Sequence, residues 1–137
     1  MKTELKNIAA FLATAAWANG YYAEEEKGQM KEIAEALGID EKAFIEAVET
    51  EIAKLDEMNE DEAGEYLIDY AAAIDEEDVI ALMECAIEIV LADGIIEREE
   101  VETLFDLADA TGTISHTDVL LMVADLIKYE PEIEVKF

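Results

Sequence analysis

Two acidic segments contain the residues of this sequence that are best placed to do chemistry. Asp93-Gly94 is followed by a glutamate, Glu100, seven positions after the aspartate, and Asn19-Gly20 is followed by Glu26 at the same spacing. Carboxylate oxygens in a loop can bind a hard cation such as Ca²⁺. A carboxylate in the first turn of a helix can also stabilise that turn. Both kinds of chemistry have to be weighed for these segments.

A calcium loop of the EF-hand type is one interpretation of the second segment. Gly94, Ile96 and Glu100 match the last part of such a loop, in which glycine, an aliphatic residue and glutamate occupy positions six, eight and twelve. The first and third ligand positions would then be Ile89 and Leu91, whose side chains carry no ligand atom. A standard EF-hand is therefore excluded.

A purely structural interpretation accounts for the same residues. Glycine tolerates a positive φ and aspartate makes local side-chain hydrogen bonds, so Asp93-Gly94 is suited to a turn. Glu100 would then be the third residue of the following helix. There its carboxylate can bond back to the residue that precedes the helix, and it lies at the favourable end of the helix dipole.

The elements that must position these segments are helical. The sequence is 53% hydrophobic and has one proline and six glycines, a composition that favours helices. The two acidic segments lie 74 residues apart (positions 20 and 94), and the glycines at 38 and 112 have the same separation. We therefore predict an all-α, compact bundle of about seven helices with an internal pseudo-duplication. Helices one to three would correspond to helices five to seven, and helix four would be a connector.

The expected boundaries follow from residues that start and end helices. Residues 1–137 form a single domain, with copy one at about 4–56, a connector at about 57–74, copy two at about 75–129 and a tail at 130–137. The residues expected to start helices are Thr3, Asp40, Asn59, Asp75 and Ser115, and those expected to follow helix ends are Gly38 and Gly112. The tail, which contains Pro131, is expected to fray or pack loosely.

The charge restricts the possible partners. The chain has 36 acidic and 9 basic residues and a net charge of −27. Such a field repels nucleic acid and anionic lipid headgroups, and it attracts cations and basic proteins. No apolar run is long enough to span a bilayer, so no direct membrane insertion is expected. The single cysteine, Cys85, is expected to be a buried structural thiol, and a reducing cytoplasm is the default location.

Two further features have an ordinary and a functional interpretation. His116 is the only histidine and is expected to lie on the surface at the start of a helix. A role in proton transfer would need an orienting carboxylate and a pocket, and Asp118 is near it in sequence only. The densest acidic run, residues 56–62, is expected to be a solvated junction between helices. The alternative for this run is a docking site for a basic partner, with Met58 as an apolar contact.

The second acidic segment also carries a family resemblance. Leu91-Ala92-Asp93-Gly94-Ile95-Ile96 with Glu100, followed by an amphipathic helix to Gly112, resembles the TerB-like family. That family includes the tellurite-resistance protein TerB and the N-terminal domain of a DnaJ-type membrane co-chaperone. The resemblance extends from about Ile8 to Ile127, and it implies a bundle of about seven helices with an internal duplication.

The resemblance also implies a function. The acidic motif residues of TerB-like domains are proposed to bind divalent metal, and the proteins act in stress-response assemblies, often near membranes. Carried over to this sequence, Asp93, Glu100 and Glu26 would be metal ligands. Asn19 stands where the first copy would have aspartate, and its amide oxygen would bind a cation more weakly. Oxygen ligands imply Ca²⁺, Mg²⁺ or Mn²⁺ rather than zinc.

The resulting expectation is a non-enzymatic, cytoplasmic TerB-like protein, peripheral to the inner face of the membrane through its partners. It would bind divalent cations, a basic protein partner, or both, through its acidic loops. Two alternatives stay open. One is a metal-dependent hydrolase that uses helix carboxylates, and the other is an acidic module that mimics nucleic acid to bind a basic protein. Direct handling of tellurite is not expected, because tellurite is an anion and the chain is strongly negative.

Overall fold

Helices dominate the parts of the chain that the computed structural model describes, which are residues 2–18, 24–91, 95–129 and 134–136. The helices are α1 (Leu5–Ala18), α2 (Glu24–Leu37), α3 (Glu41–Asp56), α4 (Glu60–Ala72), the short 3₁₀ helix η1 (Glu76–Asp78), α5 (Val79–Val90), α6 (Arg98–Thr111) and α7 (His116–Tyr129). Two three-residue strands, β1 (Ile95–Glu97) and β2 (Glu134–Lys136), complete the described elements. The predicted all-α class with seven helices is confirmed.

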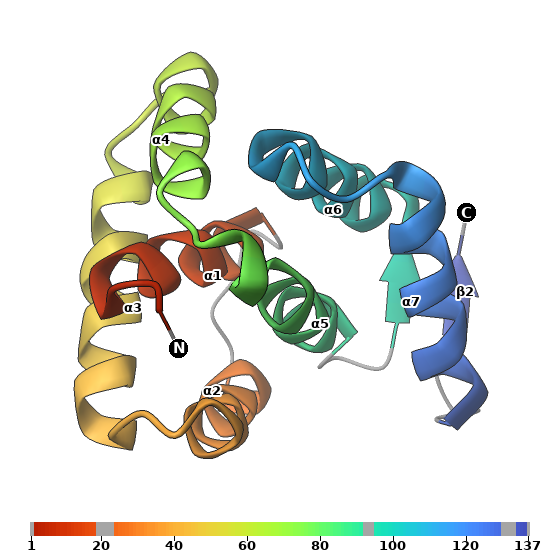
Figure 1. Cartoon of the computed structure of the whole chain (residues 1–137), viewed down its shortest axis with the longest axis horizontal. Helices are drawn as coiled ribbons and strands as arrows, with labels where there is room; N and C mark the ends of the chain where they lie inside the picture. Colours follow the sequence, from red (N-terminus) through yellow and green to blue (C-terminus); the bar gives the residue numbers. More distant parts are fainter. Residues whose placement is uncertain (1, 19–23, 92–94, 130–133, 137) are drawn as a thin grey trace.

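Helix α1 lies at the centre of the packing. It contacts α3 most extensively and also packs on α4, α5 and α6. Its buried residues run continuously from Ile8 to Ala16, as expected for a helix that is apolar all round. Many of them are alanines, whose small side chains let neighbouring helices approach closely. Figure 1 shows α3 along the left, α2 at the bottom, and α6 and α7 on the right of this centre.

Local capping sets most helix boundaries as predicted. Asp40 Oδ2 accepts a hydrogen bond from the Ala43 amide at the start of α3. Asn59 forms a reciprocal capping box with Glu62 at the start of α4. Asp75 Oδ1 caps η1 by accepting from the Glu77 amide, so α5 itself begins only at Val79. These helix starts are fixed by side chains within three residues of the cap.

The helix ends at Gly38 and Gly112 also follow the prediction. Both glycines have a positive φ, 71° and 72°, a conformation that residues with a Cβ adopt at a cost. At the end of α2, the Ile39 amide donates to the Ala34 carbonyl and the Gly38 amide donates to the Glu35 carbonyl, which is a Schellman motif. At the end of α6, the Gly112 amide donates to the Ala108 carbonyl instead.

Thr3 does not cap the first helix as predicted, because its polar atoms bind a distant part of the chain. Its hydroxyl donates to Asp78 Oδ2 at 2.6 Å and its amide donates to the same oxygen at 2.8 Å. The hydroxyl oxygen also accepts from the Asp75 amide at 2.9 Å. Thr3 and Asp78 are both buried. The N-terminal segment is therefore joined to η1, and α1 begins two residues later, at Leu5.

The predicted duplication is visible in helix lengths but not in helix packing. Helices α2 and α6 begin 74 residues apart, at 24 and 98, and end 74 residues apart, at 37 and 111. In the first half, however, α1 packs mainly on α3, whereas in the second half α5 contacts α6 more extensively than α7. The duplication therefore stays a prediction from the sequence.

The tail is more ordered than expected. Strand β2 pairs in parallel with β1, in the register Ile95↔Glu134, Ile96↔Val135 and Glu97↔Lys136. The expectation of a loosely packed tail is therefore wrong for residues 134–136, and Pro131 lies outside the described residues. Backbone hydrogen bonding explains the difference, because β1 offers a short unpaired edge between the second acidic segment and α6.

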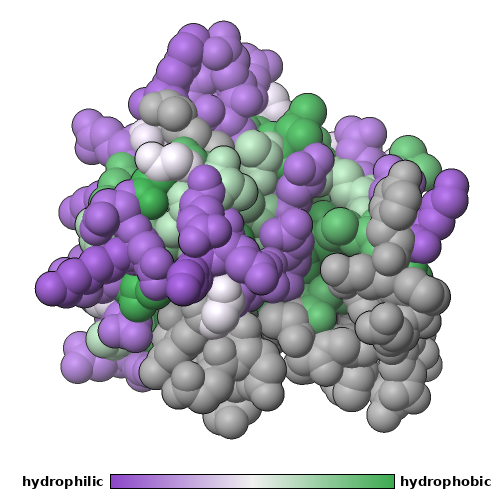
Figure 2. Space-filling view, turned by 90° about the horizontal axis from the view of Figure 1, so that it is seen from below, coloured by the Kyte–Doolittle hydropathy of each residue, from purple (hydrophilic) through white to green (hydrophobic). Residues whose placement is uncertain are grey.

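The surface follows the composition. On the face shown in Figure 2, hydrophilic residues predominate among those drawn in colour, and apolar residues show between them. None of the helices within the described ranges is long and apolar enough to cross a membrane.

Candidate functional site

The predicted metal ligands lie at the starts of two helices and in the segments that precede them. Glu100 is the third residue of α6, and Glu26 is the third residue of α2. The side chain of Glu26 lies outside what the structure describes, as do Asn19 and Asp93. Glu100 is half-buried, and its Oε2 atom is buried. Of the four predicted ligands, the structure therefore places the side chain of Glu100.

The position of Glu100 agrees with the capping interpretation and is compatible with a ligand role. A carboxylate in the first turn of a helix interacts favourably with the helix dipole. Among the described side chains, the structure places no group of three or more His, Cys, Asp or Glu residues that could hold a metal ion. This result does not bear on the predicted set, because three of its four side chains lie outside the described residues.

The helices that flank the two acidic segments pack against one another. Helix α5, which precedes the second segment, contacts α1, α2 and α6. Gln29 on α2 donates a hydrogen bond from Nε2 to Glu88 Oε2 on α5, at 3.1 Å. At the end of α1, Trp17 Nε1 donates to Asp56 Oδ1 at 3.1 Å. The ends of the helices that enter and leave these segments are thus held by side-chain hydrogen bonds.

Cys85 is a structural thiol, as predicted. It is buried on α5, and burial is the main cause that raises the pKa of its thiol to about 12, with smaller contributions from Glu88 and Glu84. A thiol with such a pKa is almost entirely protonated near neutral pH, so it is a poor nucleophile and a poor metal ligand.

The acidic run at residues 56–62 is a junction between helices, as predicted. Asp56 ends α3 and accepts the hydrogen bond from Trp17. Asn59 and Glu62 form the capping box of α4. Met58 is half-buried and packs against the core. Four residues of this run are therefore used within the fold.

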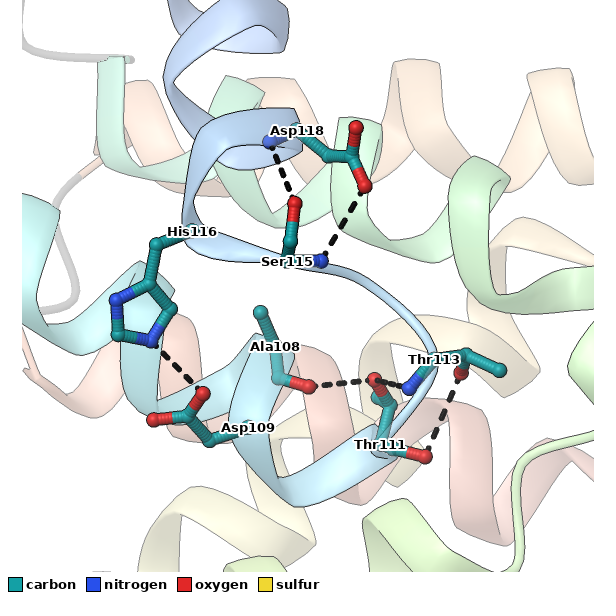
Figure 3. A network of polar contacts seen from close by, with 7 residues as sticks. All are labelled: Ala108, Asp109, Thr111, Thr113, Ser115, His116 and Asp118. Carbon is teal, nitrogen blue, oxygen red and sulfur yellow. Dashed lines mark hydrogen bonds and ion pairs between the residues drawn. The ribbon is translucent and has the colours of Figure 1, made fainter.

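His116 is exposed, as expected, but it has a carboxylate partner that the sequence did not indicate. Its Nε2 atom lies 2.8 Å from Asp109 Oδ1 on α6, and Figure 3 shows the two side chains pointing toward each other. The imidazole ring stacks on Phe105, with ring centroids 4.3 Å apart and an interplanar angle of 1°. Ser115 caps α7, accepting from the Asp118 amide through Oγ while its own amide donates to Asp118 Oδ2.

The electrostatics around His116 are those of a surface latch. The pKa of Asp106 is raised above its usual value of 3.8 by partial burial, then by Asp109 and Glu102, while His116 opposes the shift. Histidine and aspartate together join the last turn of α6 to the first turn of α7. The partner was missed because a seven-residue separation across a helix–helix turn is not a helical spacing.

Comparison with known proteins supports the resemblance seen in the motif. The family described as tellurite resistance protein TerB matches residues 5–122, which is well over half of the chain. No curated protein and no solved structure gives a significant match. The matched range includes both acidic segments and all helices up to the middle of α7. The chain therefore belongs to the TerB family.

Proposed function

We propose that this chain is a non-enzymatic member of a cytoplasmic, tellurite-resistance-type assembly and that it binds a divalent cation through its acidic segments. Glu100 would be the central ligand, with Asp93, Glu26 and Asn19 supplying further oxygen atoms. The observation that carries the proposal is the half-buried carboxylate of Glu100, in the first turn of α6 and close after the second acidic segment.

Burial of Glu100 has an energetic consequence. A carboxylate that loses water is destabilised unless hydrogen bonds or a nearby positive charge compensate. The start of α6 supplies part of that compensation through the helix dipole. A bound cation would supply more, and Glu26 at the equivalent position of α2 would bring a second carboxylate from the other segment.

The donor set selects the class of cation. Carboxylate and amide oxygens suit Ca²⁺, Mg²⁺ and Mn²⁺ better than softer metals. Because Asn19 carries no charge, the first segment contributes less attraction than it would with aspartate. We expect moderate rather than tight affinity, since ligand charge is one of the factors that set the dissociation constant in such sites.

The same properties argue against direct chemistry on tellurite. The net charge of −27 repels an anion. Cys85 is a single buried thiol whose pKa is about 12, so it is unsuited to thiol-based reduction. A role as scaffold or sensor in a resistance assembly fits these properties better.

A metal-dependent hydrolase is the weaker alternative. A helical carboxylate site of that type usually includes a histidine three residues after a glutamate on the same helix. His116 instead stacks on Phe105 and binds Asp109 at the surface. This arrangement supports a non-enzymatic role.

Isothermal titration calorimetry with CaCl₂, MgCl₂ and MnCl₂ tests the proposal on the wild type and on Glu100→Gln. We expect the substitution to weaken binding of at least one cation by about tenfold or more, because it removes a charged ligand and keeps the side-chain shape. Glu26→Gln should weaken binding in the same direction.

Glu102→Gln is the matched control. Glu102 is exposed on the same helix, and its substitution removes the same charge. Equal effects of Glu100→Gln and Glu102→Gln would show that cations only screen the surface charge. Absence of binding by all three cations would reject the site.

A further inference from the structure

A second candidate binding site lies at a groove that the acidic segments do not form. Its volume is about 470 Å³, and it lies between the start of α5 and the face of α7. The apolar residues that line it are Val79, Ile80, Ile114, Leu121 and Met122. The three charged residues that line it are Glu76, Asp118 and Asp125, and all are acidic.

Two of the apolar residues at this groove are unusually open to solvent. Ile80 is 61% exposed and Leu121 is 60% exposed. Both appear among the large hydrophobic residues that the described part of the surface exposes. Large exposed apolar residues that gather at one hollow, with polar residues around them, are typical of a binding surface.

Helix α7 presents a regular pattern to the groove. Asp118, Leu121, Met122 and Asp125 occupy positions i, i+3, i+4 and i+7 and therefore share one face of the helix. Two apolar residues are thus flanked by a carboxylate one turn before and one turn after them. Grooves that take amphipathic helices read anchors at the same spacing.

Charge complementarity identifies the occupant. The three carboxylates favour lysine or arginine on the bound molecule, and the apolar floor favours leucine, isoleucine or phenylalanine between them. A second copy of this chain carries the same net charge of −27 and is repelled. Anionic lipid is repelled for the same reason.

We propose that this groove binds an amphipathic helical segment of a partner protein, with apolar residues flanked by lysine or arginine at helical spacing. The site is independent of the acidic segments and goes beyond the cation binding proposed above. It gives the protein a contact that can hold a basic partner whether or not a cation is bound.

A designed peptide is the probe for this proposal. It is a fluorescent helix of about fourteen residues with Lys, Leu, Leu and Lys at i, i+3, i+4 and i+7 and with alanine and glutamine elsewhere. A peptide of the same composition, in which the leucines no longer share a face, is its control. Binding is measured by fluorescence anisotropy at an ionic strength of about 0.15 M.

The matched variants separate the groove from general attraction to a negative surface. Ile80→Ser combined with Leu121→Ser removes apolar contacts without changing the charge, and we expect it to weaken binding about tenfold or more. Ile68→Ser is the control, because Ile68 is 58% exposed on α4 and should leave binding unchanged. Asp125→Asn should weaken binding more than Asp69→Asn, an exposed control on α4.

Several outcomes would overturn the proposal. One is equal affinity for the two peptides, and another is equal affinity of the wild type and the double variant. No binding at millimolar peptide would also reject it. A wild-type dimer in sedimentation velocity that Leu121→Ser dissociates would assign the groove to a second copy. Circular dichroism melting curves establish that each variant is folded.

Discussion

At the scale of single residues, Thr3 and Asp78 form the most buried polar contact between distant parts of the described chain. The two residues lie 75 positions apart, and Asp78 Oδ2 accepts from both the hydroxyl and the amide of Thr3. We expect Thr3→Val to lower the free energy of unfolding by about 1.5–3 kcal/mol, since it removes a hydrogen bond to a buried carboxylate and leaves the Asp75 amide without its acceptor. Urea unfolding at neutral pH measures the change.

The pH dependence of this effect distinguishes a charged contact from simple packing. The pKa of Asp78 is lowered from its usual 3.8, mainly by the Thr3 hydroxyl. A lowered folded-state pKa gives stability that is present above the unfolded value and lost as the pH falls through the folded value. The difference between wild type and Thr3→Val should therefore shrink below pH 3.8. Thr3→Ser keeps the hydroxyl and is the control; a loss as large as that of valine would contradict the assignment.

These residues also show where prediction from the sequence stops. Asp40, Asn59 and Ser115 were predicted correctly as caps because each bonds to an amide three residues away. Thr3 was predicted as a cap for the same reason, but its partner lies across the fold. Asp109 and His116 were not paired for a related reason, because the turn between α6 and α7 brings them together. Contacts set by tertiary packing leave no local signal.

At the scale of helices, the glycines provide an opposed pair of substitutions. Gly112 follows α6 with a φ of 72°, where a Cβ is unfavourable, so Gly112→Ala should destabilise the protein by about 1 kcal/mol. Gly64 lies inside α4, and a Cβ there would meet nothing within 4 Å. Gly64→Ala should therefore stabilise by about 0.5–1 kcal/mol. Urea unfolding compares the two variants, and changes of the same sign would contradict this account of the helix ends.

The arrangement of helices could be predicted only in part. Alternating apolar faces and end signals placed α2 and α6 at equivalent positions, because these features depend on neighbouring residues. The contacts of α7 could not be inferred, since they depend on how a helix with few fully buried residues settles on α5 and α6. Only Val119 and Val123 are fully buried on it. The same limited burial leaves the groove between α7 and α5.

At the scale of the whole molecule, charge and core act against each other. A continuous apolar core forms around α1 and α5, while 36 acidic residues against 9 basic ones repel one another across the surface. Basic residues form few compensating contacts within the described ranges, such as Lys2 with Glu77 and Lys54 with Glu51. Exposed pairs of this kind contribute little, typically about 0–1 kcal/mol. The class of partner therefore followed from composition, whereas the site of contact required the fold.

Salt should stabilise this protein measurably. Mobile ions screen repulsion between surface carboxylates, and the screening length falls from about 30 Å at 0.01 M to about 8 Å at 0.15 M ionic strength. We expect the melting temperature to rise by several degrees over this range, since about 1 kcal/mol corresponds to a few degrees for a domain of this size. Chloride salts avoid the separate stabilising effect of sulfate. MgCl₂ and NaCl are compared at equal ionic strength, because an additional rise with Mg²⁺ that Glu100→Gln abolishes would report site binding beyond screening. A melting temperature that stays flat or falls in both salts would show that self-repulsion does not limit the stability of this fold.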